Sequence, residues 1–211
     1  MSNGFEQHLS TLPLIAILRG VTPNECEAVT EALYAAGFRI VEVPLNSPSA
    51  LESIERLAKQ FGDQMLVGAG TVLTTDEVNE IYNSGGKLIV APNTNIDVIR
   101  TSVGLNLTTI PGAATPSEAF AAMTAGADAV KVFPAEMVSP QILASWRSVI
   151  PDTLPLIPVG GIDGNTMAAY WQAGASGFGL GSALFKPGKS LGDVSASAIK
   201  LVWSMSSAMK H

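Results

Sequence analysis

The chain has 211 residues, of which 47 % are hydrophobic and only 14 % are charged, a balance that excludes an intrinsically disordered chain. Lysine and arginine number 12 against 18 aspartates and glutamates, a net charge of −6 without a basic run, so neither a nucleic acid nor an anionic membrane is expected as a partner. The N-terminus lacks a basic and then apolar leader, and no stretch approaches the roughly 18 apolar residues of a membrane span, which predicts a cytoplasmic protein.

Short apolar runs recur along the chain, and each predicts a buried strand. They cover residues 14–18, 40–45, 65–70, 88–92, 107–111, 129–133, 156–159 and 177–180. Strands that are apolar almost throughout are typical of a parallel sheet with both faces covered by helices.

Helix signals lie between these runs. Thr N-cap signals stand at Thr22, Thr74 and Thr115, each followed three residues later by a glutamate, and weaker Ser-Pro signals stand at Ser47 and Ser139. Glycines that can end helices in the left-handed conformation follow at positions 37, 62, 85, 104, 126 and 174.

Eight strand–helix units in succession favour an α/β fold, a single compact (β/α)8 TIM barrel that spans residues 1–211 as one domain. An open doubly wound sheet is the alternative. In such a barrel the active site lies at the C-terminal ends of the strands, so polar residues at those ends are the candidates for chemistry.

Glu42 and Lys131 are the strongest candidates, because each interrupts an apolar strand. A buried ion pair that fixes packing, or a lysine on the outer face under a helix, would explain the pattern without function. A buried ion pair, however, rarely recovers the cost of removing both charges from water. Burial in a cavity would instead lower the pKa of Lys131 and leave a nucleophilic amine.

Glycine-rich stretches close the last two predicted strands, at VGGIDGN (159–165) and GLGSALF (179–185). Such turns let a phosphate approach backbone N–H groups, and phosphate sites are frequent at these two strand ends. Arg19, at the end of the first strand, could neutralise a substrate carboxylate or a nearby acid. Thr71 could bind a substrate oxygen or cap the chain.

No clustered histidines and cysteines, and no acidic triplet, predict a metal site, and no cofactor is expected. Cys26 stands between Glu25 and Glu27, which disfavour a thiolate, so a structural thiol is expected.

In chain order, PLIAILRG (13–20), VEVPLNSP (41–48), GAGTVL (68–73), VKVFPA (130–135), PVGGI (158–162) and GLGSALF (179–185) resemble the class I 2-keto-3-deoxy-6-phosphosugar aldolases. The gluconate-specific branch of that family usually has arginine where this chain has Asn46, and threonine where it has Val159. Both departures favour the galactonate-specific branch.

The resemblance implies a metal-free homotrimer that reversibly cleaves 2-dehydro-3-deoxy-6-phosphogalactonate to pyruvate and D-glyceraldehyde 3-phosphate. It also implies site roles: Lys131 matches the Schiff-base lysine and Glu42 the glutamate that moves protons. Arg19 and Thr71 match contacts to the pyruvyl part. The phosphate positions are Gly160, Gly161, Gly181 and Ser182.

Other functions remain open on the sequence alone. The substrate could be the gluconate epimer, since the two sugars differ only at C4. An isomerase or epimerase that works by acid–base chemistry would fit the same fold and phosphate site without a covalent adduct. A phosphosugar-binding protein without catalysis would not need the lysine.

Overall fold

The structure is a computed structural model that describes residues 4–210, and strands alternate with helices along it. The strands are β1 (Leu14–Ile17), β2 (Ile40–Pro44), β3 (Leu66–Gly70), β4 (Leu88–Val90), β5 (Thr108–Ile110), β6 (Gly112–Ala113), β7 (Val130–Val132), β8 (Leu156–Pro158) and β9 (Phe178–Leu180). The helices are α1 (Phe5–Thr11), α2 (Cys26–Ala35), α3 (Ala50–Phe61), α4 (Thr75–Asn83), α5 (Ile96–Gly104), α6 (Pro116–Ala125), the 3₁₀ turn η1 (Ala135–Met137), α7 (Pro140–Arg147), α8 (Met167–Gln172) and α9 (Leu191–Ala208).

The strands form two sheets, and every pairing among the described strands is parallel. The first sheet has six strands in the order β5-β4-β3-β2-β1-β9, and the second has three in the order β6-β7-β8. One isolated bridge, Val159 to Gly179, lies between the end of β8 and β9. From β1 to β5 the first sheet follows chain order, and β9 pairs with β1 on its other side, so it lacks the order of a doubly wound sheet.

The predicted closed (β/α)8 TIM barrel is therefore wrong. Pro111, which has no N–H to donate to a ladder, divides the predicted strand 107–111 and its continuation into β5 and β6, which belong to different sheets. At the other junction, the ladder that would join β8 to β9 is reduced to the single bridge. The assignment of residues 1–211 to one domain stays a prediction.

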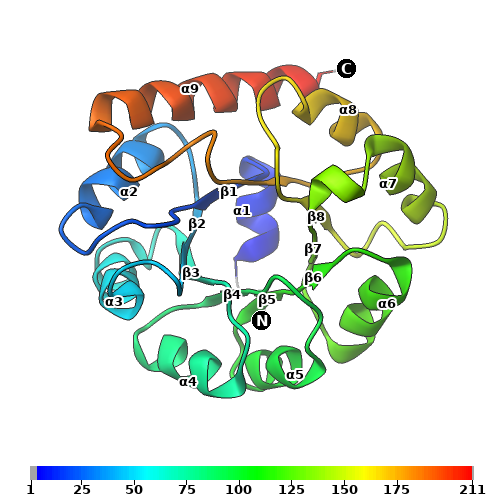
Figure 1. The fold of residues 1–211 in the computed structure, drawn as a ribbon, viewed down its shortest axis with the longest axis horizontal. Helices are drawn as coiled ribbons and strands as arrows, with labels where there is room; N and C mark the ends of the chain where they lie inside the picture. The colour runs from blue at the N-terminus through cyan, green and yellow to red at the C-terminus, as the bar shows by residue number, and fades with distance from the viewer. Residues whose placement is uncertain (1–3, 211) are drawn as a thin grey trace.

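Helices α2 to α9 surround the strands, and α1 lies inside that ring (Figure 1). Phe5 and Leu9 of α1 belong to an inner apolar cluster, and Leu9 also lies beside Gly177, just before β9. Helix α1 therefore closes the N-terminal ends of the strands and leaves the C-terminal ends for a site. Within residues 4–210, no helix is both long and apolar enough to cross a membrane.

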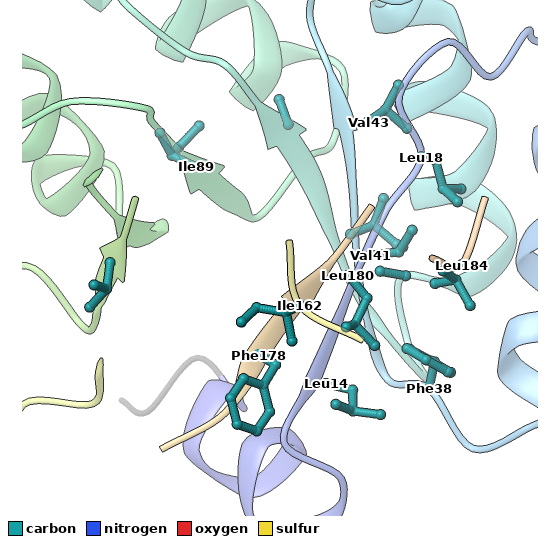
Figure 2. Close-up of a cluster of buried hydrophobic side chains, with 14 of the residues drawn as sticks. Leu14, Leu18, Phe38, Val41, Val43, Ile89, Ile162, Phe178, Leu180 and Leu184 are labelled. Atoms are coloured by element: carbon teal, nitrogen blue, oxygen red, sulfur yellow. The ribbon is translucent and has the colours of Figure 1, made fainter. Parts of the chain in front are cut away.

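Alternate residues of each strand point to opposite faces and so build two separate cores. The outer core packs strands against helices and includes Leu14, Val41, Phe178 and Leu180 (Figure 2). The inner core takes the intervening positions, among them Ile15, Ile40, Leu66, Leu88 and Ile157. By this alternation Glu42 shares the inner face with Ile40, and Lys131 shares it with Ala129.

Three of the predicted N-caps are confirmed: Thr74, Thr115 and Ser139 each accept a backbone N–H of the following helix. The other two take different roles. Helix α2 begins only at Cys26, and the Ser47 hydroxyl accepts the N–H of Gly20 instead of capping α3.

Four of the predicted C-terminal glycines, Gly37, Gly85, Gly126 and Gly174, have left-handed backbones, with φ between 80 and 109°. Gly62 has a right-handed φ of −60°, and Gly104 still belongs to α5.

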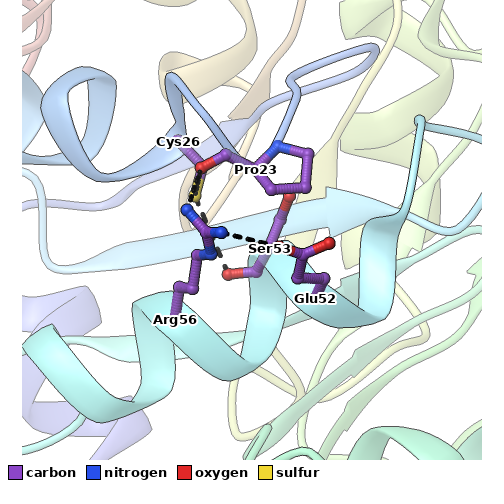
Figure 3. A network of polar contacts seen from close by, with 5 residues as sticks. All are labelled: Pro23, Cys26, Glu52, Ser53 and Arg56. Carbon is purple, nitrogen blue, oxygen red and sulfur yellow. Dashed lines mark hydrogen bonds and ion pairs between the residues drawn. The ribbon is translucent and has the colours of Figure 1, made fainter.

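Arg56 ties the segment before α2 to α3 (Figure 3). Its guanidinium donates to the carbonyl of Pro23 at 3.0 Å and to Glu52 at 2.7 Å. Cys26 lies beneath this contact, fully buried, and burial raises the pKa of its thiol. Its sulfur is 3.4 Å from the Pro23 carbonyl, in agreement with a structural thiol.

Arg147 holds together the segments that precede β8 and β9. Its guanidinium donates to the carbonyls of Gly174 at 2.8 Å, Pro151 at 3.1 Å and Leu154 at 2.9 Å, and to the hydroxyl of Ser176 at 2.9 Å. These contacts lie at the N-terminal side of the junction between β8 and β9, where the N–H of Ser176 also donates to the carbonyl of Leu156 at 2.8 Å.

We therefore expect Arg147→Met to lower the free energy of unfolding by about 2–4 kcal/mol, because it leaves partly buried carbonyls without a charged donor. Arg100→Met, at an exposed position of α5, is the matched control and should change it by less than about 0.5 kcal/mol. Urea denaturation of both variants measures the difference. Equal, small effects would show that the Arg147 contacts do not stabilise the junction.

Candidate active site

A cavity of about 460 Å³ opens at the C-terminal ends of the strands. Six of the eight predicted site residues line it, and they come from three of the strand ends and from β7. These are Arg19, Lys131, Gly160, Gly161, Gly181 and Ser182. Glu42 and Thr71 lie outside its walls.

Lys131 occupies the centre of β7, between Gly112 of β6 and Ile157 of β8. Its side chain is only 5 % exposed, yet it reaches the cavity wall. Burial lowers the pKa of its amine, the negative charge of Glu42 opposes this shift, and Arg19 adds to it. The Nζ atom lies 4.5 Å from the centre of the Phe133 ring, whose face can attract a positively charged nitrogen at this position.

Glu42 lies on β2 opposite Ile17 of β1 and Gly68 of β3. It is 2 % exposed, and burial raises the pKa of its carboxyl to about 7, although Lys131 and Arg19 oppose the shift. Its Oε2 atom has no hydrogen-bond partner in the described part of the chain. A carboxyl with such a pKa can exchange protons near neutral pH.

Gly70 makes the space for this carboxyl, because a Cβ atom on Gly70 would collide with both oxygens of Glu42. Among residues 4–210, no ion pair joins Glu42 to Lys131, so the packing ion pair is not what the structure shows. The charges of the two groups still influence each other's pKa across the interior.

Arg19 is exposed at the rim of the cavity, two residues after the end of β1. Its guanidinium donates to the side-chain oxygen of Asn46 at 2.7 Å, while the neighbouring Gly20 N–H donates to Ser47 at 2.9 Å. Both bonds tie the end of β1 to the end of β2. Asn46, which accepts only through its amide oxygen, orients Arg19 without cancelling its charge.

Thr71 follows Gly70 at the end of β3 and has a left-handed φ of 62°. A threonine rarely adopts this conformation, and such strain concentrates at functional sites. Its contact with a substrate stays a prediction.

The glycine pair at the end of β8 has left-handed backbones, with φ of 105° at Gly160 and 63° at Gly161. A Cβ atom on either would press against the carboxylate of Glu136, which lies beside the turn. After β9, the carbonyl of Gly181 accepts the N–H groups of Leu184 and Phe185 at 2.9 and 3.0 Å. Both turns bring backbone to the wall of the cavity.

Phe133 and Lys186 also line the cavity, and neither was predicted from the sequence. Phe133 lies two residues after Lys131, and the alternation of strand side chains was the signal that could have found it. Lys186 belongs to a loop, where no periodicity predicts which way a side chain points.

No metal site is evident in the described chain: residues 4–210 contain no group of three or more histidine, cysteine, aspartate or glutamate side chains placed to hold an ion.

Comparison with known proteins agrees with this arrangement. The family model described as KDPG and KHG aldolase matches residues 5–199. The 2-dehydro-3-deoxy-6-phosphogalactonate aldolase of Escherichia coli (strain K12) is 44 % identical over 185 residues, which are 88 % of this chain and 90 % of the relative.

The chain is also similar to solved structures. One described as native KDPGal superposes with a TM-score of 0.93 at 42 % identity, over 95 % of this chain and 97 % of that one. KDPG aldolase from Legionella pneumophila, with pyruvate captured at low pH as a covalent carbinolamine intermediate, superposes with a TM-score of 0.82 at 25 % identity, over 98 % of each chain. This chain belongs to the KDPG and KHG aldolase family.

Proposed function

We propose that this chain is a class I aldolase that reversibly cleaves 2-dehydro-3-deoxy-6-phosphogalactonate to pyruvate and D-glyceraldehyde 3-phosphate. The observation that carries the proposal is Lys131, a buried amine with a lowered pKa at the wall of the cavity. The Escherichia coli relative bears the name of this activity.

Lys131 acts first. Its neutral amine attacks the C2 ketone and gives a carbinolamine, and loss of water then gives an iminium. The ring of Phe133 lies where it can stabilise the positive nitrogen. The carbinolamine captured in the Legionella relative supports this covalent route.

Glu42 then moves the protons. Its carboxylate accepts the proton of the C4 hydroxyl, directly or through a water, while the electrons of the C3–C4 bond pass into the iminium. The aldehyde leaves, and the enamine that remains is protonated at C3. Water hydrolyses the resulting iminium, which frees pyruvate and Lys131. A pKa of about 7 suits a group that must both accept and return a proton.

The other residues hold the substrate. Arg19, at the rim and oriented by Asn46, faces the carboxylate of the pyruvyl part, and Thr71 contributes a hydroxyl there. Gly160, Gly161, Gly181 and Ser182 offer the phosphate backbone N–H groups and a hydroxyl. The resemblance further supports a cytoplasmic homotrimer, which sedimentation would test.

Trapping with borohydride tests the covalent step. Incubation with pyruvate and borohydride should add a reduced pyruvyl group at Lys131, and peptide mass mapping should locate it. Lys131→Ala should abolish both the adduct and cleavage, whereas Lys87→Ala, at an exposed lysine on the N-terminal side of β4, should keep both. Absence of any adduct in the unaltered protein would refute the proposed aldolase activity and favour an isomerase that works by acid–base chemistry.

The pH dependence of Glu42 has opposite signs for activity and for stability. Activity needs the carboxylate, so kcat/KM should fall as the pH drops below about 7, and Glu42→Gln should lower it by about 10²- to 10⁴-fold.

The pKa of Glu42 is about 7 in the folded protein and 4.5 when unfolded. Proton binding by Glu42 therefore stabilises the fold fully below pH 4.5, and this stabilisation is lost as the pH rises through about 7.

Glu42→Gln should therefore be more stable than the unaltered protein by about 3 kcal/mol at pH 8, and equally stable near pH 4. Denaturant titrations at both pH values measure this. Glu55→Gln, at an exposed site on α3, should show no such pH dependence. A stability gain of Glu42→Gln that is the same at both pH values would contradict the raised pKa.

Steady-state rates with the purified C4 epimers test the choice of sugar. The galactonate epimer should have a kcat/KM at least about 10-fold higher, since Val159, at the cavity wall near the phosphate turn, carries no hydroxyl to bind a sugar oxygen. A higher value for the gluconate epimer would reassign the substrate and leave the lysine chemistry intact.

A further inference from the structure

The charged residues that line the cavity are all cations, although the carboxylate of Glu136 lies beside the glycine turn at the end of β8. Arg19, Lys131 and Lys186 line the cavity, and no aspartate or glutamate of residues 4–210 does so, although the whole chain has a net charge of −6. In the proposed function, Lys131 forms the covalent bond to the substrate. Arg19, which donates to Asn46, binds the carboxylate of the pyruvyl part. Lys186 is the cation that has no role so far.

Lys186 lies in the loop 181–190, between β9 and α9, which also contains Ser182. Hydrogen bonds within the loop fix its path: Lys189 N–H donates to the carbonyl of Lys186 at 3.1 Å, and the Lys189 ammonium donates to the carbonyl of Leu184 at 2.9 Å and to Ser197 at 2.7 Å. The two lysines therefore differ. The ammonium of Lys189 is engaged inside the loop, whereas Lys186 is exposed and lines the cavity.

The loop 181–190 packs closely against the turn that follows β1. Gly20 has a left-handed φ of 81°, and a Cβ atom there would lie 2.7 Å from the ring of Pro187. The absence of a side chain at Gly20 thus lets Pro187 sit on the turn after β1. Lys186, next to Pro187, is held at the mouth of the cavity between the Arg19 turn and the glycine turns.

We propose that Lys186 is the side-chain cation that binds the phosphate dianion of the substrate, beside Ser182 and the backbone of Gly161 and Gly181. This rests on the proposed function. Backbone N–H groups supply directed but neutral donors, and a phosphate monoester with about two negative charges needs a full positive charge nearby as well. A lysine on a flexible stem is suited to that task as a point charge.

A phosphate contact that is made equally in the ground state and in the transition state raises affinity without changing kcat. Lys186→Met should therefore raise the KM for the phosphorylated substrate by about 10- to 100-fold with kcat nearly unchanged. The inhibition constant of inorganic phosphate should rise by a similar factor, and Lys186→Arg should restore most of both. Lys59→Met, an equal charge change at an exposed position of α3, should alter neither value.

Two further measurements distinguish phosphate binding by Lys186 from a purely structural role of this residue. They also distinguish failure of this proposal from failure of the proposed aldolase function. Borohydride trapping of pyruvate at Lys131 should proceed in Lys186→Met at the rate of the unaltered protein, since pyruvate has no phosphate. Loss of trapping would show that Lys186 only supports the fold of the site and would overturn the proposal.

Calorimetric titration with inorganic phosphate tests the same contact without turnover. Weaker binding by Lys186→Met than by Lys59→Met supports the proposal even if the sugar substrate were assigned wrongly. Equal binding by the two variants overturns it, whereas absence of a pyruvate adduct in the unaltered protein would overturn the proposed function itself.

Discussion

The burial of two ionisable groups in an apolar interior is the constraint on which the rest of this structure depends. Glu42 and Lys131 occupy inner-face positions that isoleucine, leucine and alanine fill elsewhere, and water is largely excluded from both. Removal from water disfavours the charged form of each group, so the acid becomes weaker and the amine becomes less basic. In the proposed mechanism, the same desolvation that disfavours the two charges near neutral pH is what lets the two groups react there.

Within residues 4–210, the chain leaves space for these groups without joining them in an ion pair. Gly70 leaves room for the Glu42 carboxyl, and the left-handed glycines after β8 let the backbone reach the cavity beside Glu136. A direct ion pair would have stabilised both charges and brought both pKa values back towards favouring ionisation. No ion pair joins the two groups within residues 4–210, and Glu42 Oε2 has no hydrogen-bond partner in that part of the chain.

The sequence predicted the positions of the strands well, because each apolar run is bounded by turn and cap signals. It did not predict the sheet pairing, since the break at Pro111 and the single bridge from Val159 to Gly179 depend on contacts between distant segments. Lys131 and Glu42 could be found because a charge in an apolar strand is conspicuous. Lys186 could not, because the direction of a loop side chain depends on packing such as that of Pro187 against Gly20.

Helix α1 has a consequence for the order of events in the proposed cleavage. Because Phe5 and Leu9 of α1 pack into the inner core at the N-terminal ends of the strands, the cavity at the C-terminal ends is the way out for both products. In the proposed mechanism the phosphorylated aldehyde is free once the C3–C4 bond breaks, whereas the pyruvyl fragment is still joined to Lys131. Release is therefore sequential, with the aldehyde departing first and pyruvate last, and condensation in the reverse direction requires pyruvate to enter before the aldehyde.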